Sequence, residues 1–202
     1  GFTNLTRDHL DYHGTMENYF QAKRRVFTMC KTAVINIDDE YGKRLAQEFS
    51  DIAVTYSAEG NADYHAEFIR MNATGCSYML VNEREKTACR VDMNMTGLYN
   101  VQNSLCAIAM VTALGFDMTE CAKALSDLDG VDGRMNVVYR GDFTVITDYA
   151  HTDDALIKVL STLKPLTKGR LICVFGAAGD RDKEKRPMMA KAAEDNADIL
   201  VI

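Results

Sequence analysis

A lysine stands among apolar residues shortly after a segment that holds two histidines and two aspartates. Residues 8–14 read DHLDYHG, and Lys23 follows in a stretch where apolar residues, among them Phe20, Val26 and Phe27, recur three and four positions apart. This spacing is typical of the buried side of an amphipathic helix, so we expect Lys23 to face the interior. A buried ammonium group is costly and requires a partner, the loss of its proton or a chemical modification. In the alternative interpretation, the lysine lays its methylene groups on apolar surface and its ammonium group reaches water.

Polar residues also follow two predicted strands in the second half of the chain. Asp148, Tyr149 and His151 come at the end of the first strand, and the second leads into the turn FGAAGDRD at residues 175–182. Parallel α/β sheets bind ligands at the carboxyl ends of their strands, so we expect a ligand at this edge. The turn differs from the dinucleotide motif GxGxxG, which disfavours such a cofactor. Alternatively, His151 is a structural histidine and the charged run 180–187 is solvated surface.

Strands and helices alternate along most of the chain. Apolar runs predict strands at residues 32–38 and 52–57, and alternating apolar and polar residues predict paired β segments between residues 64 and 96, with turns at NATG and NERE. An amphipathic helix follows near residue 97. Its predicted apolar side comprises Val101, Leu105, Ile108, Val111 and Leu114.

A tract rich in glycine and aspartate, DGVDGRMN at residues 129–136, is typical of a boundary between domains. Beyond it, strands and helices alternate in the order βαβαβ from residue 143 to the last residue. This order predicts a parallel, doubly wound sheet. We therefore expect an α/β protein with two domains.

The composition excludes several classes of function. A net charge of −6 and a pI near 5.2 give no overall basic footprint for nucleic acid or for an anionic membrane, and the sequence has no long Lys/Arg tract. No apolar run approaches the ~18 residues of a membrane-spanning helix, and the first residues do not form a signal peptide. The six cysteines show no CxxC or metal-finger spacing, so we expect reduced thiols in a cytoplasmic protein. The chain starts at GFTNL and stops at ADILVI, and we interpret it as a piece of a longer protein.

Six segments, taken together and in order, are characteristic of one enzyme family. They are DHLDYHG, the Ala-Lys pair of the following helix, GLYNVQN, GRMN, DYAHTDDAL and FGAAGDRDKEKRP, and they extend over nearly the whole chain. This set resembles the Mur ligases and, within them, the UDP-N-acetylmuramoyl-tripeptide synthetases of the MurE type. The resemblance implies the later part of a central ATPase domain at residues 1–138, with a mixed sheet and flanking helices. It implies the first part of a Rossmann-like C-terminal ligase domain at residues 139–202.

The resemblance also implies a chemical modification of Lys23. In Mur ligases the matching lysine carries a carbamate formed with carbon dioxide, which turns a cation into an anionic oxygen donor. Carbon dioxide reacts with the uncharged amine, the form that burial favours. A carbamate suits Mg²⁺, which prefers oxygen ligands and takes few of them from a protein. His9 matches the histidine that such enzymes place at a second magnesium ion.

An ATP site follows from the same resemblance. Asn103 matches the asparagine that reads adenine, and Arg134 matches an arginine that contacts the nucleotide near the domain junction. Asp148 matches the carboxylate that accepts the ribose hydroxyls, with Tyr149 and His151 lining the same pocket. Taken alone, Asn103 has the alternative role of capping the helix start, and Arg134 that of a surface charge.

Three basic residues are implied at an amino-acid site. Arg181 matches the arginine that holds a carboxylate of the incoming amino acid, and Lys185 and Arg186 follow it closely. The implied reaction uses ATP and Mg²⁺ to add meso-diaminopimelate or L-lysine to UDP-N-acetylmuramoyl-L-alanyl-D-glutamate in peptidoglycan synthesis. The implied enzyme is a cytoplasmic monomer that binds neither nucleic acid nor membrane.

The phosphate-binding motif GxxGK[ST] is absent from the 202 residues, so we expect them to be inactive alone. Two alternatives stay open. One is a ligase similar to folylpolyglutamate synthetase, and the other is a catalytically inert nucleotide-binding or interaction fragment. The combination of DHLDYHG, DYAHTDDAL and GDRD favours a Mur ligase over the first alternative.

Overall fold

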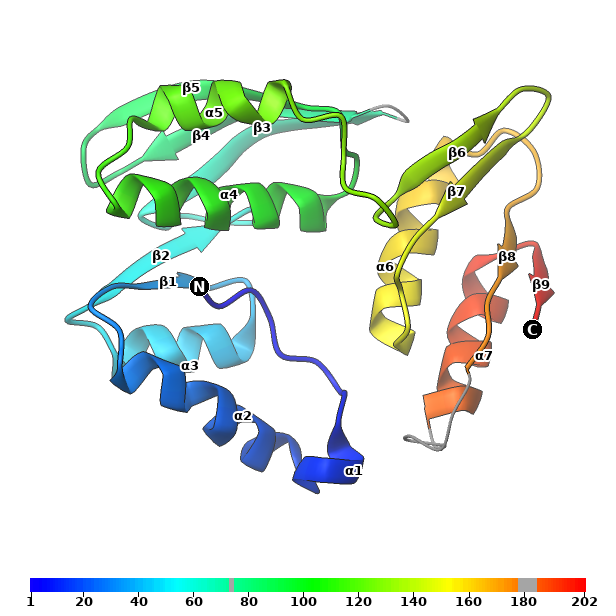
Figure 1. Ribbon diagram of the computed structural model, residues 1–202, viewed down its shortest axis with the longest axis horizontal. Helices are drawn as coiled ribbons and strands as arrows, with labels where there is room; N and C mark the ends of the chain where they lie inside the picture. The colour runs from blue at the N-terminus through cyan, green and yellow to red at the C-terminus, as the bar shows by residue number, and fades with distance from the viewer. Residues whose placement is uncertain (73–74, 178–184) are drawn as a thin grey trace. The chain divides into compact units, whose positions relative to one another are not determined.

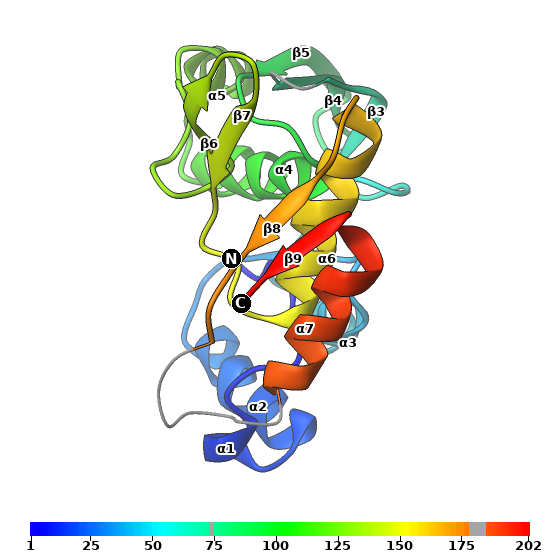
Figure 2. The same ribbon diagram turned by 90° about the vertical axis from the view of Figure 1, so that its right-hand side faces the viewer.

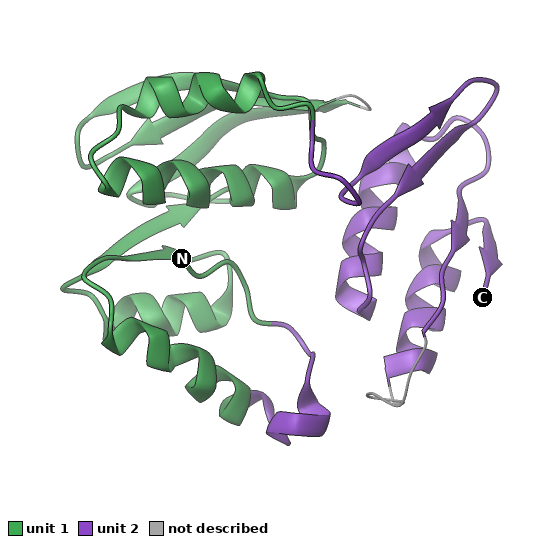
Figure 3. Cartoon of the chain, viewed as in Figure 1, with its two compact units in different colours: residues 1–5, 17–129 green, residues 6–16, 130–202 purple. Residues whose placement is uncertain are grey.

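The computed structural model describes residues 1–72, 75–177 and 185–202. The chain divides into two compact units, shown in two colours in Figure 3. Unit 1 comprises residues 1–5 and 17–129, and unit 2 comprises residues 6–16 and 130–202. The DHLDYHG segment therefore packs with the second half of the chain. The predicted domain boundary between residues 138 and 139 stays a prediction, because compact packing does not define a domain that folds alone.

A five-stranded mixed sheet forms the centre of unit 1, with the strands in the order β1-β2-β3-β4-β5. Pairing is parallel from β1 to β3 and antiparallel from β3 to β5. The strands are β1 (Ala33–Asn36), β2 (Ala53–Ser57), β3 (Tyr64–Asn72), β4 (Gly75–Asn82) and β5 (Thr87–Met93). All were predicted. The predicted NERE turn joins β4 to β5, whereas the NATG turn lies partly outside the described residues.

Helices cover both faces of the parallel part of this sheet (Figure 1). α3 (Glu40–Glu48) contacts β1 and β2 on one face, and α4 (Leu98–Ala113) contacts β1, β2 and β3 on the other. α5 (Met118–Ser126) packs on α4 and β5. The predicted apolar side of α4 is confirmed for Val101, Leu105 and Ile108, which are buried. It is wrong for Val111 and Leu114, which are exposed, because the buried side of α4 ends before them.

The α-helix around Lys23 ends before the apolar pattern of the sequence does. α1 (Leu10–His13) precedes α2 (Met16–Arg24), which continues as the 3₁₀ helix η1 (Arg25–Thr28). A 3₁₀ helix has about 3.0 residues per turn instead of about 3.6, so its side chains leave the line of the α2 face. Phe20 and Phe27 are buried, as predicted, but Val26 is 56% exposed.

Apart from α1, the described residues of unit 2 form an antiparallel hairpin, two α-helices and a parallel strand pair. These elements are β6 (Asn136–Arg140), β7 (Thr144–Thr147), α6 (Asp153–Leu163), the 3₁₀ helix η2 (Lys164–Leu166), β8 (Ile172–Val174), α7 (Lys185–Asn196) and β9 (Ile199–Val201). α6 and α7 lie side by side in Figure 2, and their shared core includes Leu160, Met189 and Ala193. No helix among the described residues is both long and apolar enough to cross a membrane.

The predicted parallel sheet is confirmed for β8 and β9, which pair in parallel. It is wrong for β7, which pairs antiparallel with β6, a strand that was not predicted. Only residues 141–143 separate these two strands, and a connection this short can join antiparallel strands but not parallel ones.

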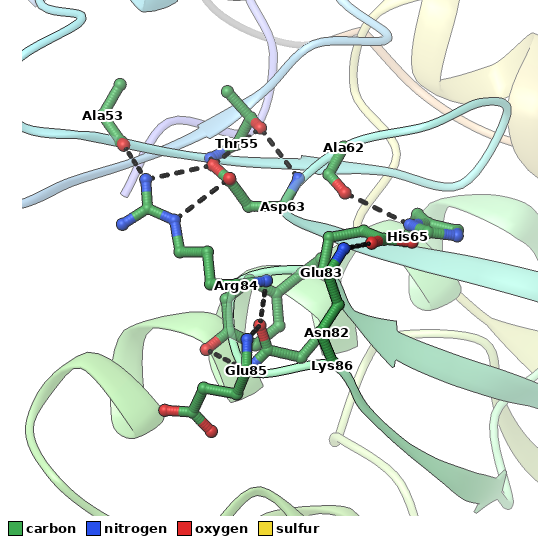
Figure 4. Close-up of polar contacts among 11 residues, drawn as sticks. Ala53, Thr55, Ala62, Asp63, His65, Asn82, Glu83, Arg84, Glu85 and Lys86 are labelled. Carbon is green, nitrogen blue, oxygen red and sulfur yellow. Dashed lines mark hydrogen bonds and ion pairs between the residues drawn. The ribbon is translucent and has the colours of Figure 1, made fainter.

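A carboxylate connects β2 with two loops of unit 1 (Figure 4). Asp63 Oδ2 accepts hydrogen bonds from Thr55 N and Thr55 Oγ1, at 2.7 and 2.9 Å, and Arg84 Nε lies 3.0 Å from Asp63 Oδ1. Burial acts to raise the pKa of Asp63, but the hydrogen bonds from Arg84 and Thr55 outweigh it and hold that pKa below its ordinary value. The ionised form is therefore the one that stabilises the fold.

Asp63→Asn is expected to lower the free energy of unfolding by about 1–2 kcal/mol near neutral pH. Because the pKa of Asp63 is lowered on folding, its contribution is fully present above the ordinary value of 3.8 and is lost as the pH falls through the lower folded value. Urea unfolding over a pH series measures the free energy of unfolding of both proteins. The difference between wild type and Asp63→Asn in this free energy should become smaller below pH 3.8.

Asp92→Asn is the matched control for this prediction. It breaks an ion pair with Arg90 in which both side chains are largely exposed, so the unfolding free energy should change by less than about 0.5 kcal/mol. An equal loss in the two variants would contradict the role given to Asp63.

Candidate functional site

The helix that carries Asn103 begins after Gly97, whose φ of 107° lies in the region that favours glycine. Asn100 Nδ2 donates a hydrogen bond to Thr96 O over 2.8 Å and holds the start of α4. Asn103 lies beyond this first turn on an exposed side of the helix. It is therefore accessible to a ligand and is not the helix cap. The structural role of Asn100 was missed, because sequence spacing does not distinguish the two asparagines.

Lys23 is exposed in unit 1, and the prediction that it is buried is wrong. Its Nζ atom lies 5.4 Å from the centroid of the Tyr19 ring, a cation–π contact one turn back along α2. Phe20 is the buried residue of this helix. A position within the apolar pattern did not decide burial here, because the flexible lysine stem lets its head group reach water. The prediction that Lys23 carries a carbamate is therefore supported by the family resemblance and not by burial of the lysine.

His9 stands in unit 2 with its side chain 55% exposed. Its Nε2 atom lies 3.3 Å from Asp8 Oδ2, and its backbone N–H donates to Asp8 Oδ1 over 3.0 Å. Its φ of 54° is unusual for a residue other than glycine. Asp8 thus fixes both the backbone and the ring of His9.

The donors present are compatible with Mg²⁺. Among the described residues, no group of three or more His, Cys, Asp or Glu side chains is arranged to hold a metal ion. Mg²⁺ requires fewer protein ligands than that, because it keeps several of its waters. Within its own unit, His9 offers an exposed ring beside the carboxylate of Asp8, and Lys23 offers an amine that carbon dioxide can reach.

The carboxylate of Asp148 holds two backbone segments of unit 2 together. Its Oδ2 accepts from Met135 N over 2.9 Å, and its Oδ1 accepts from Ala150 N over 2.8 Å. Met135 has a φ of 48°, which turns the chain at GRMN. Each carboxylate oxygen has a further lone pair, so Asp148 remains able to accept hydrogen bonds from the hydroxyl groups of a ligand.

Arg134, Tyr149 and His151 lie in contact next to Asp148. The guanidinium carbon of Arg134 is 4.8 Å from the centroid of the Tyr149 ring, and the rings of Tyr149 and His151 are 5.1 Å apart in an edge arrangement. Tyr149 is 64% exposed and presents an accessible ring. The structure therefore brings together these predicted residues of unit 2, and Arg134 is not an isolated surface charge.

Asp8 has neighbours that the sequence did not reveal. His151 Nε2 lies 3.7 Å and Lys185 Nζ lies 3.8 Å from its carboxylate oxygens. Asp8 thus connects His9 with two residues predicted from the second half of the chain. Arg186 is exposed, and Arg181 lies outside the described residues. The sequence signals for Asp8 were its place directly before His9 and its position in the DHLDYHG segment.

Residues 1–111 match the model of the Mur ligase middle domain, and residues 133–202 match that of the Mur ligase, glutamate ligase domain. The chain belongs to the Mur ligase family. It is 41% identical over 204 residues to UDP-N-acetylmuramoyl-L-alanyl-D-glutamate--2,6-diaminopimelate ligase from Clostridium botulinum, an alignment covering 100% of this chain and 42% of that relative.

A solved structure of a ligase with the same name is 38% identical to this Mur ligase chain, with a TM-score of 0.70, over 98% of this chain and 42% of that one. An FPGS–AMPPCP–folate complex is 13% identical, with a TM-score of 0.77, over 98% of this chain and 49% of that one. At that identity the likeness shows the fold alone. The predicted family and α/β fold class are confirmed, and the roles of the individual site residues stay predictions.

Proposed function

We propose that this chain belongs to an ATP-dependent ligase that adds meso-diaminopimelate to UDP-N-acetylmuramoyl-L-alanyl-D-glutamate. The observation that carries the proposal is the 41% identity over the entire chain to a ligase named for this reaction. The chain spans 42% of that relative's length, so the activity belongs to a complete enzyme containing these residues. Of the two diamino acids considered, this relative's name favours diaminopimelate over L-lysine.

The reaction has two steps. The D-glutamyl carboxylate attacks the γ-phosphorus of ATP, forming an acyl phosphate and releasing ADP. The amine of diaminopimelate then attacks the acyl carbon, an amide bond forms, and inorganic phosphate leaves with the bonding electrons of the broken C–O bond. Such reactions depend mainly on positioning the reactants and on stabilising the charge of the transferring phosphoryl group. In this proposal the residues of this chain contribute to both.

The nucleotide-binding residues in this proposal are those that the family resemblance implies. Asn103 reads the adenine, and Asp148 accepts the ribose hydroxyls with the lone pairs that its backbone contacts leave available. Arg134 is held over the Tyr149 ring, where its guanidinium group contacts the nucleotide.

At the amino-acid site, Arg181 binds a carboxylate of diaminopimelate, because a guanidinium group matches a carboxylate in a two-point contact. Lys185 and Arg186 add positive charge. His151 lies beside the nucleotide residue Tyr149 and also faces Asp8, which contacts Lys185. Asp8 is thus placed to orient side chains of both sites.

His9 and a carbamate on Lys23 would hold magnesium. The ion supplies positive charge that offsets the developing charge on the phosphoryl group. We further propose that the enzyme is a cytoplasmic monomer that binds neither nucleic acid nor membrane, which the acidic composition supports.

Phosphate release by the complete enzyme, measured with different acceptors, tests the proposal. ATP, Mg²⁺ and the UDP-linked dipeptide should give phosphate with meso-diaminopimelate. Phosphate release only with a folate acceptor and L-glutamate would instead support the folylpolyglutamate synthetase-like alternative. Nucleotide binding without turnover with any acceptor would support the inert binding module.

A further inference from the structure

A partly buried polar cluster lies where β1 and β2 end, and it reaches across to α4. This cluster, here named the Asp38 cluster, consists of Asn36, Asp38, Ser57 and Gln102. Asn36 and Ser57 are the last residues of β1 and β2 and are 3% and 2% exposed. The carboxyl ends of parallel strands are where α/β sheets bind their ligands. None of these four residues was predicted to have a functional role.

The carboxylate of Asp38 accepts three hydrogen bonds. Ser57 Oγ donates to Oδ1, while Ala58 N and Gln102 Nε2 both donate to Oδ2, each over 2.9 Å. Ser57 Oγ itself accepts from Glu59 N and Gly60 N, so its own proton is directed toward Asp38. The two strand ends are therefore connected to each other through Asp38.

The contact with Gln102 has a defined direction. A carboxylate only accepts hydrogen bonds, so the amide nitrogen of Gln102 faces Asp38 and the amide oxygen faces away. Asp38 is fixed in turn, because its backbone N–H donates to Asn36 Oδ1 over 3.0 Å and Asn36 Nδ2 donates to Thr3 O over 2.8 Å. Gln102 thus contacts an anchored partner.

The bond constrains the part of α4 that carries Asn103. The neighbours Val101 and Leu105 are fully buried, but apolar contacts are not directional and tolerate small rotations and shifts of a helix. A hydrogen bond requires a particular distance and angle. The bond from Gln102 to Asp38 therefore sets the orientation of the helix turn on which Asn103 is exposed.

We infer that Asp38 is a positioning residue for the nucleotide base, acting through Gln102 to hold Asn103 in place. This inference rests on the proposed function, in which Asn103 reads the adenine of ATP. Asp38 and Gln102 do not contact the nucleotide in this arrangement. Their effect is on the affinity for ATP and on the preference for adenine over other bases.

Two substitutions of Gln102 test the inference in the complete ligase. Gln102→Met keeps the length of the side chain but removes the donor, and it should raise the KM for ATP by about tenfold. The KM for diaminopimelate and kcat should stay close to wild type, and the preference for ATP over GTP should fall. Gln102→Lys keeps a donor toward Asp38 and should restore most of the ATP affinity and base preference.

The matched control is Asp117→Ala, which removes the N-cap of α5 and its bonds from Thr119 N and Glu120 N. It should lower Tm as much as Gln102→Met or more, without changing the preference for ATP over GTP. An unchanged KM for ATP in Gln102→Met would overturn the inference. If Gln102→Lys failed to restore the preference for ATP over GTP, the inference would also be overturned. Gln102 would then act on the nucleotide itself and not through its bond to Asp38. A wild-type enzyme without ATP-dependent ligation would overturn the proposed function instead.

Discussion

Lys23→Ala is expected to lower the turnover of the complete ligase by at least about 100-fold. In the proposed enzyme, a carbamate on Lys23 supplies the anionic oxygen donor for magnesium, and alanine has no amine on which to form it. Steady-state phosphate release at saturating ATP measures the loss. Added bicarbonate should not restore activity, whereas added acetate or formate should restore part of it by supplying carboxylate oxygens.

A spectroscopic readout tests the modification without relying on activity. The enzyme equilibrated with carbon-13 bicarbonate should give a carbamate NMR signal that is absent from Lys23→Ala. The control is Lys31→Ala, which removes another exposed lysine of unit 1 and should retain both the signal and the activity. Near-normal turnover in Lys23→Ala would contradict the proposal that Lys23 carries a carbamate that holds magnesium.

Asp148→Ala should raise the KM for ATP by about 10- to 100-fold. The substitution removes the acceptor proposed for the ribose hydroxyls. It also removes the acceptor for Met135 N and Ala150 N, which releases the turn that places Arg134 over the Tyr149 ring. Two of the proposed nucleotide contacts are therefore weakened by one change. Initial rates at varied ATP and varied diaminopimelate separate this effect from a general loss of activity.

Asp142→Ala provides the control for Asp148, because it removes an exposed aspartate from the turn between β6 and β7. Its KM values should match those of wild type. If Asp148→Ala raised the KM for ATP and that for diaminopimelate equally, Asp148 would be a structural residue and not part of the nucleotide site.

The sequence by itself determined the strands of unit 1, the helix that begins near residue 97, and the family. Strand and helix periods are local properties, since they follow from backbone geometry over a few residues. The buried trio Val101, Leu105 and Ile108 shows that the period of α4 was correctly interpreted. The ordered motifs identified the family because their residue types must recur for the same chemistry to occur.

Only the tertiary structure decided which of these patterned residues are buried. Lys23, Val26 and Leu114 all continue an apolar pattern, but each is exposed. Periodicity says which side of a helix a residue occupies, whereas burial depends on whether another element covers that side.

Pairing between distant segments was likewise decided by the tertiary structure. Asp148 binds Met135, and Asp38 binds Gln102 across 64 residues of sequence. A hydrogen bond between distant residues forms only where the fold has already brought them within about 3 Å, and no local pattern encodes that proximity. The sequence therefore identified the family and most of the elements, and the fold determined which side chains come into contact.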